Sequence, residues 1–208
     1  AVGGILACAV MFVVACGEDA RSPIEPGSAL RPAGPPGGFP VVQVRPDVPG
    51  NAQGAVTNNL TDAVDRVAAG GTIRVHAGTY PTHEVVIDRP VTIEGVGDPL
   101  VVNETGSTSL AVGGVGAGTV VVRGLSFRDD VGTHPTGPAA SIALEADFGN
   151  LVVEESSFEG VIGETRSIFQ RAATSTGSPT LAVRGSSFTS GQSAIRVFNQ
   201  SGPAVDVT

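Results

Sequence analysis

The sequence predicts an all-β protein, a right-handed single-stranded parallel β-helix with a short helix at its N-terminal end. One observation is a repeat, because similar strand segments occur at 120–127, 151–158 and 181–188. A second is that short apolar segments separated by Gly, Pro and Ser fill the chain after residue 70. A third is the repeat length, since three strands of about five residues with their connections make about 27–31 residues, one coil of a β-helix.

Equivalent residues of successive coils lie about 4.8 Å apart, so the repeat predicts columns of side chains. Phe127, Phe158 and Phe188 form one expected interior column. Three further columns are expected: Val122, Val153 and Val183; Leu110, Ile142, Ile168 and Ile195; and, on an outer face, an alternating charge ladder of Glu94, Arg123, Glu154 and Arg184. A β-propeller is the main alternative, but its blades need about 40–50 residues and hairpin turns. Right-handed winding is the rule for parallel crossovers.

Two elements are expected before the first repeat. Residues 57–69 are predicted to form a helix, with Thr57 or Asn58 as its cap and Gly70-Gly71 as its end. Five apolar residues share one face of this helix at spacings of three and four: Leu60, Ala63, Val64, Val67 and Ala68. Residues 41–44 are expected to form a short first strand.

Three motifs follow the predicted helix: Gly70-Gly71-Thr72-Ile73-Arg74-Val75, Ala77-Gly78-Thr79-Tyr80 and Pro90-Val91-Thr92-Ile93-Glu94-Gly95. Together with the helix they resemble the opening segment of the pectin-lyase-like superfamily of right-handed β-helices. The resemblance covers residues 58–208 and implies a helix that plugs the open end of the fold. It also implies a link to polysaccharides, because pectin esterases and polysaccharide lyases share this segment. The motifs are architectural, so they leave the activity open.

The first residues predict export. Residues 5–15 are apolar, and this run is too short for a bilayer, which needs about 20 residues, but suits the apolar part of a signal peptide. Val13-Val14-Ala15-Cys16 resembles a bacterial lipoprotein box, in which the Cys receives a lipid. The alternative is a plain secretory signal or a small buried Cys.

These features predict three segments: a signal peptide at 1–15, a Pro/Gly-rich tether at 16–52 and a β-helix at 53–208 that continues beyond Thr208. The protein is then an exported, membrane-anchored lipoprotein, periplasmic or at the cell surface, that touches the membrane only through a lipid on Cys16. A formal net charge of −8 without a basic run excludes nucleic acid as a partner.

The catalytic motifs of the enzymes in this superfamily have no full match in the chain. The nearest polar cluster is Asp129, Asp130 and His134, with Glu145 and Asp147 after the next turn. Paired carboxylates could hold calcium or act as acid and base, whereas the alternative is a solvated loop. No other cofactor is expected, and three scattered His residues without Cys partners predict no metal site.

Two local features are ambiguous. Asp147-Phe148-Gly149-Asn150 has a superficial likeness to a pectin esterase motif, but is expected to make a turn before the strand at residue 151. Phe169 and Phe198 could stack on sugar rings if they point outward, although Phe is more often a core residue. In this segment Gln170 would point inward if Ile168 does.

Two functions stay open. One is a protein that binds or processes polysaccharide, as a lyase, hydrolase or esterase if it is an enzyme. The other is a non-catalytic β-helix module for adhesion or cell-envelope structure. An acidic cluster beside an Arg on one outer sheet would favour the first, and a surface whose charges pair with one another would favour the second.

Overall fold

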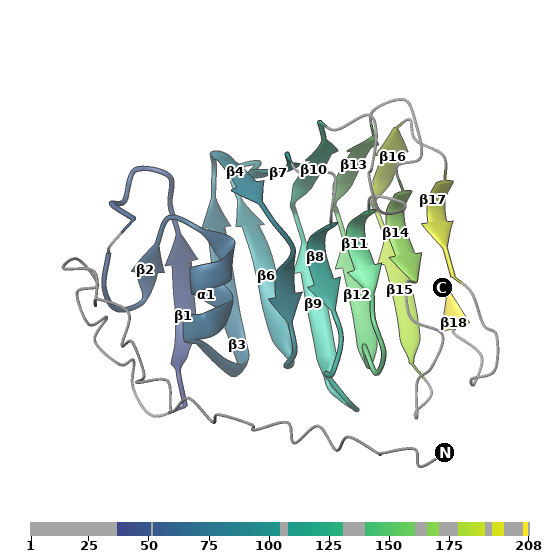
Figure 1. Cartoon of the computed structure of the whole chain (residues 1–208), viewed down its shortest axis with the longest axis horizontal. Coiled ribbons are helices and arrows are strands. Elements are labelled where there is room, and N and C mark those ends of the chain that lie inside the picture. The colour runs from purple at the N-terminus through teal and green to yellow at the C-terminus, as the bar shows by residue number, and fades with distance from the viewer. Residues whose placement is uncertain are drawn as a thin grey trace, which may run out of the picture. The chain divides into compact units, whose positions relative to one another are not determined.

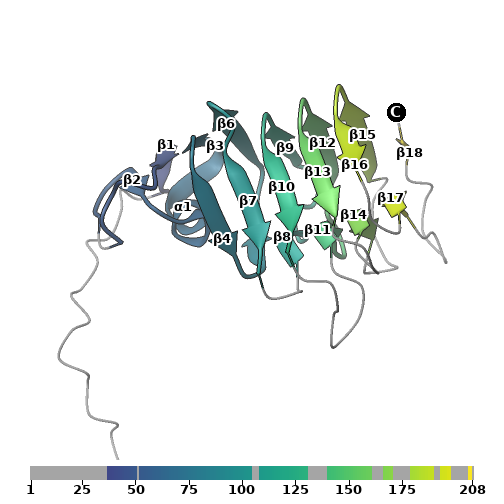
Figure 2. The same ribbon diagram turned by 90° about the horizontal axis from the view of Figure 1, so that it is seen from above.

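The computed structural model describes residues 37–50, 52–104, 108–130, 140–160, 166–170, 179–189, 193–197 and 206–207. Their strands wind into a right-handed parallel β-helix with three sheets along its length (Figure 1, Figure 2). The predicted fold class is confirmed.

Each coil passes through the three sheets in turn. Sheet A holds, in spatial order, β2 (Val56–Thr57), β1 (Phe39–Val44), β3 (Val67–His76), β6 (Val91–Val96), β9 (Thr119–Arg123), β12 (Asn150–Glu154), β15 (Thr180–Arg184) and β18 (Asp206–Val207). Sheet B holds β4 (Thr79–Thr82), β7 (Leu100–Asn103), β10 (Ser126–Asp129), β13 (Ser157–Gly160) and β16 (Ser187–Thr189). Sheet C holds β5 (Val85–Ile87), β8 (Thr108–Val112), β11 (Ala140–Leu144), β14 (Arg166–Gln170) and β17 (Ser193–Arg196).

The coils differ in length more than the repeat predicts. Val153 pairs with Val122 of the preceding coil and with Val183 of the following coil, so these two steps have the predicted repeat length. Ile73 and Ile93, by contrast, pair across a much shorter stretch of chain. The predicted coil length is therefore wrong for the first coil, because its strand β5 and the connections between its strands are short.

The interior is made of the predicted columns. Phe127, Phe158 and Phe188 are aligned across β10, β13 and β16, with 5.0 Å between successive ring centroids. Tyr80 and Val101 begin the same column in β4 and β7. The other predicted interior columns are also in register: Val122, Val153 and Val183 in sheet A, and Leu110, Ile142, Ile168 and Ile195 in sheet C. These columns join one continuous apolar core.

The capping helix is shorter than predicted. It is α1 (Leu60–Arg66), and the side chain of Asn59, rather than of Thr57 or Asn58, accepts the capping hydrogen bond from the Asp62 amide at 2.7 Å. Leu60, Ala63 and Val64 are buried against the core, as the pattern predicted, so the helix covers the N-terminal end of the β-helix (Figure 1).

The helix ends early because sheet A takes over its last predicted turn. Val67 begins β3 and pairs with Phe39 of β1, so its backbone is extended. The register between β1 and β3 then shifts at a bulge. Gly71 sits in this bulge, where a Cβ would lie 2.9 Å from the Pro40 carbonyl oxygen. The strand predicted at 41–44 is confirmed as part of β1, and it lies within the segment assigned to the tether.

Sharp corners join sheet A to sheet B. Gly124, Glu155 and Gly185 occupy the same position in three coils, with φ of 64°, 49° and 57°. This left-handed conformation costs a glycine little and other L-residues more. The Ser156 hydroxyl supports the corner by donating to the Glu154 carbonyl at 2.9 Å. The repeated corner aligns the outer face of sheet A from coil to coil.

Candidate functional site

Within the described residues, an extended arrangement of charged side chains lies on the outer face of sheet A. Glu94, Arg123, Glu154 and Arg184 are aligned across β6, β9, β12 and β15, as predicted, and Arg74 of β3 precedes them. We call these five residues the charge ladder. Its signs alternate from coil to coil between β3 and β15.

Ion pairs connect most steps of the charge ladder. Glu94 lies between two arginines, 3.5 Å from Arg74 Nε and 3.2 Å from Arg123 Nη2. A second pair joins Arg184 Nη1 to Glu154 Oε1 at 3.4 Å. Arg123 therefore turns toward Glu94 in the preceding coil. All these side chains keep contact with solvent, and the arginines expose about half or more of their surface.

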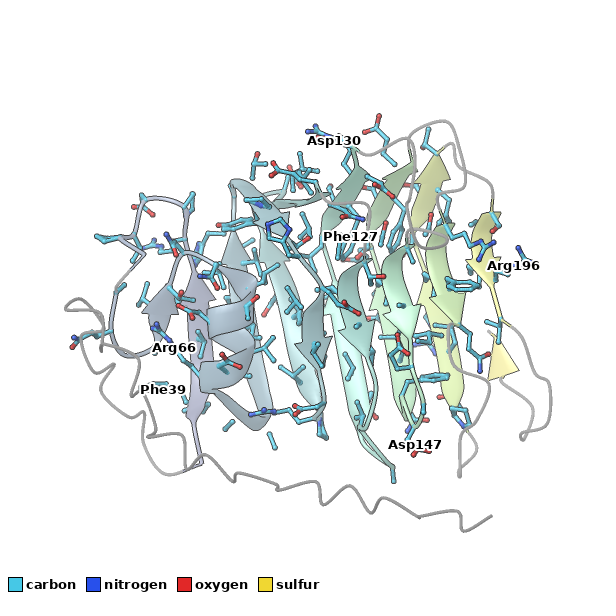
Figure 3. The ribbon with its side chains drawn as sticks, viewed as in Figure 1. Phe39, Arg66, Phe127, Asp130, Asp147 and Arg196 are labelled. Atoms are coloured by element: carbon cyan, nitrogen blue, oxygen red, sulfur yellow. The ribbon has the colours of Figure 1, made fainter. Side chains whose placement is uncertain are left out.

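The predicted acidic cluster is divided between two edges of the β-helix. Asp129 and Asp130 follow Phe127 at the end of β10, before β11, whereas Glu145 and Asp147 follow β11. Figure 3 shows Asp130 at the top of the molecule and Asp147 at the bottom. The five-residue strand β11 separates the two pairs of carboxylates by its full length. His134 lies outside the described residues.

Three of these carboxylates lie in different structural surroundings. Asp130 receives two hydrogen bonds from Arg128, from Nε at 2.6 Å and from Nη2 at 2.9 Å. The hydrogen bonds from Arg128 hold the pKa of the Asp130 carboxyl below its usual value. Asp129 is only 2% exposed and is aligned with Asn103 in a polar interior column. Asp147 forms the predicted turn, with a φ of 55° and a carbonyl that accepts from the Val115 amide at 2.9 Å.

An arginine covers the predicted sugar-stacking residue of β14. The Arg166 guanidinium carbon lies 4.3 Å from the centroid of the Phe169 ring, and Phe169 is 8% exposed. Arg196 of β17 pairs in register with Phe169. Gln170 is buried in the inward column of Leu144, as expected from the inward position of Ile168. Phe198, the second stacking candidate, lies outside the described residues.

Sequence reasoning had no signal for the contact between Arg166 and Phe169. Strand alternation places residues three apart on opposite faces, so this pair is not expected to meet. The same alternation could have predicted the pair formed by Arg128 and Asp130. Residues two apart in a strand share a face, and their charges are opposite.

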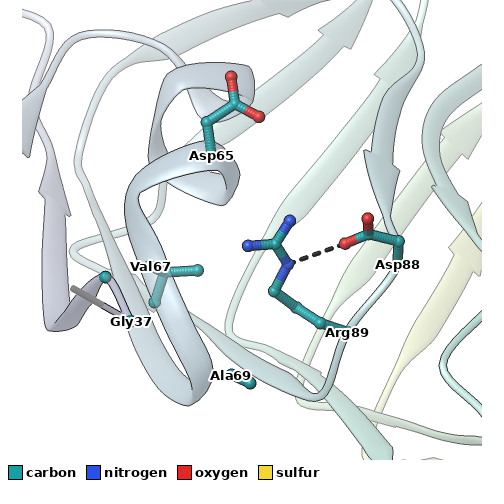
Figure 4. A pocket seen from close by; sticks show the side chains of 7 residues that line it. Gly37, Asp65, Val67, Ala69, Asp88 and Arg89 are labelled. Carbon is teal, nitrogen blue, oxygen red and sulfur yellow. Dashed lines mark hydrogen bonds and ion pairs between the residues drawn. The ribbon is translucent and has the colours of Figure 1, made fainter. Parts of the chain in front are cut away.

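A shallow groove of about 400 Å³ lies at the N-terminal end, between α1 and the segment after β5 (Figure 4). Asp65, Val67 and Arg89 line it together with Asp88. Arg89 Nε donates to Asp88 Oδ1 at 2.8 Å, and this hydrogen bond lowers the pKa of the Asp88 carboxyl. The Arg89 guanidinium in the groove is thus paired with the neighbouring Asp88 carboxylate.

Among the residues that the structure describes, no three His, Cys, Asp or Glu side chains are grouped closely enough to hold a metal ion. Within the same residues, no helix has the length and apolar character needed to span a membrane.

No protein-family model, no curated protein and no solved structure matches the chain significantly. The class of the protein therefore rests on its architecture, which is that of a right-handed parallel β-helix.

Proposed function

We propose that this chain is an exported, non-catalytic β-helix module of the pectin-lyase-like superfamily, with a role in adhesion or cell-envelope structure. The observation that carries the proposal is the charge ladder, whose acidic and basic groups pair with one another along sheet A. Charges that pair in this way are poorly placed to act as acid, base or nucleophile on a substrate. The division of the acidic cluster between the two ends of β11 supports the same conclusion.

Turnover of polysaccharides tests this proposal directly. The full chain is incubated with neutral and uronate-containing polysaccharides, and new reducing ends and unsaturated sugar ends are measured. We expect no product above the level of a heat-denatured sample. The proposal would be overturned in favour of an enzyme if the wild type forms product and Asp129→Asn does not. This comparison requires that Asp129→Asn keeps the thermal midpoint of the wild type.

The proposal places the module at the bacterial envelope through a lipid on Cys16. The apolar run at 5–15, the lipoprotein-like Val13-Val14-Ala15-Cys16 and the Pro/Gly-rich segment behind them support this placement. Labelling with a fatty acid in a bacterial host tests it. We expect label on the wild type and none on Cys16→Ser, with Cys8→Ser as the matched control that keeps the label. Equal label on wild type and Cys16→Ser would exclude the anchor.

A second candidate function is the binding of an acidic polysaccharide at sheet C. It is favoured by Arg166 over the Phe169 ring and by Arg196 beside them in register, because arginines pair well with uronate carboxylates. Affinity electrophoresis in a gel that contains polygalacturonate distinguishes the two candidates. Retardation that is lost in Arg196→Gln but kept in Arg184→Gln would favour binding at sheet C. If the wild-type protein migrates equally with and without the polysaccharide in the gel, binding at sheet C is excluded.

A further inference from the structure

The outer face of sheet A has three parallel columns of side chains. The outermost column of polar residues contains Thr119, Asn150 and Thr180. The middle column contains Val41, Thr72, Thr92, Val121, Val152 and Ala182. The third column is the charge ladder, preceded by Gln43 of β1. This face is therefore a strip of mostly small side chains with alternating charges along one border.

Solvent reaches the border of this face. Arg74, Arg123 and Arg184 expose 52%, 45% and 65% of their side chains. A guanidinium group carries five N–H donors, so an arginine that already pairs with one glutamate can still donate hydrogen bonds to a second carboxylate. In the middle column Val41 is 38% exposed, and most of the other members are half-buried.

An alternating ladder is complementary to a second copy of itself when a two-fold axis runs midway between two coils. In an isologous contact a two-fold axis makes residue i face residue j, and residue j face residue i. An axis parallel to the strands and midway between the coils of Glu94 and Arg123 places Glu94 opposite Arg123 of a second copy. The same axis places Arg74 opposite Glu154, and Gln43 opposite Arg184. All six coil levels then meet without a clash of like charge.

The same axis also matches the middle column. Thr92 then faces Val121 of the second copy, Thr72 faces Val152, and Val41 faces Ala182. These side chains are small, so two sheets could approach to the usual spacing of about 10 Å. An axis that passes through the coil of Arg123 would instead place Arg123 opposite itself and Glu94 opposite Glu154. The charges thus exclude every axis that passes through a coil. Among the axes midway between coils, only the one between Glu94 and Arg123 pairs all six strands from β1 to β15 with one another.

We propose that the outer face of sheet A binds a second copy of this chain in that two-fold arrangement. The coils of the two copies then follow one another in opposite directions. Six coil levels at about 4.8 Å and three columns of side chains give roughly 500 Å² per copy, or about 1,000 Å² in total. This area lies at the lower end for specific interfaces. The dimer is therefore weak, and it is sensitive to salt because its charged border is exposed.

Sedimentation equilibrium of the full chain tests the proposal, in a density-matched detergent solution because residues 5–15 are apolar. We expect a reversible dimer at low ionic strength that dissociates at about 1 M salt, where the Debye length falls to about 3 Å. Val121→Lys and Arg123→Glu are each expected to raise the dissociation constant at least tenfold. Val86→Lys, at an exposed position on the outer face of sheet C, is the matched control and leaves the dissociation constant unchanged.

A charge exchange gives a further arm of the experiment. The double variant Glu94→Arg with Arg123→Glu restores opposite charges across the axis, so it dimerises more tightly than Arg123→Glu alone. A wild-type chain that stays monomeric at low salt overturns the proposal. A dimer that Val121→Lys leaves intact, or that Val86→Lys disrupts equally, overturns it as well, because the interface then lies elsewhere. The dissociation constant of the wild type at several salt concentrations tests the dimer even if a variant fails to fold.

Discussion

The ring of Phe158 stacks on the ring of Phe127 one coil earlier, with 5.0 Å between the centroids and 4° between the ring planes. The spacing follows from the distance between neighbouring strands, about 4.8 Å, because both rings leave equivalent positions of paired strands. Phe188 continues the stack at the same spacing. The central ring thus contacts an aromatic neighbour on each side and is almost completely buried.

Loss of this central ring should destabilise the protein strongly. Phe158→Ala is expected to lower the free energy of unfolding by about 3–5 kcal/mol, because it removes a buried ring and leaves a cavity between two others. Glu159→Ala, at the next and exposed residue, is the control and should change stability by no more than about 0.5 kcal/mol. Urea denaturation measures both. Similar small shifts of the two midpoints would contradict the aromatic stack.

Glu155 occupies a corner where the equivalent residues of neighbouring coils are glycines. Its φ of 49° is unfavourable for a residue with a Cβ, and its side chain is exposed. Glu155→Gly is therefore expected to raise the free energy of unfolding by about 0.5–1 kcal/mol. The matched control is Glu159→Gly in β13, which should lower it by a similar amount. A thermal midpoint that falls in both variants would show that Glu155 is not strained.

Gly95 lies where two neighbouring coils approach closely. A Cβ at this position would overlap the backbone carbonyl of Gly124 in the next coil. Backbone cannot move aside as a flexible side chain can, so Gly95→Ala should lower the free energy of unfolding by about 1–3 kcal/mol. Gly50→Ala is the control, since its nearest neighbour would be the Asn58 side chain at 3.5 Å. Chemical denaturation of the two variants should separate them clearly.

The ion pairs of the charge ladder should be measurable but weak. A double-mutant cycle on Glu94 and Arg123 at low salt is expected to give a coupling energy of about 0.2–1 kcal/mol, as for other exposed pairs. The cycle on Arg123 and Glu154 should give a smaller value, because Arg123 turns toward Glu94. Both couplings should fall at high salt. A larger coupling between Arg123 and Glu154 would contradict the observed direction of pairing.

Acid should remove the stability that the ion pair between Arg128 and Asp130 gives to the folded state. Hydrogen bonds from Arg128 depress the pKa of Asp130 in the folded state, so the stabilisation is present above the unfolded pKa and is lost as the pH falls through the folded pKa. Asp130→Asn should therefore lower the thermal midpoint near pH 7, and the difference from wild type should vanish in acid. Arg128→Gln should show the same pH dependence. A difference that persists at low pH would point to another cause.

The sequence by itself determined how one coil relates to the next. A residue and its equivalent one repeat later must lie on the same column, because parallel strands in register repeat at a spacing of about 4.8 Å. The Phe column and the sign alternation from Glu94 to Arg184 follow from this arithmetic alone. The first part of the predicted apolar face of α1, Leu60, Ala63 and Val64, was determined as well, since periodicity of side chains is a local property, whereas Val67 and Ala68 of the same pattern lie in β3.

Only the tertiary structure decided relations within a coil and at its end. The helix stops at Arg66 because Val67 pairs with Phe39, a residue far away in the sequence that no local pattern reveals. The candidate carboxylates separate for a similar reason. Asp130 and Asp147 are close in sequence, but the extended strand β11 carries the chain from one edge of the β-helix to the other between them. Closeness in sequence becomes closeness in space only where the intervening chain turns back.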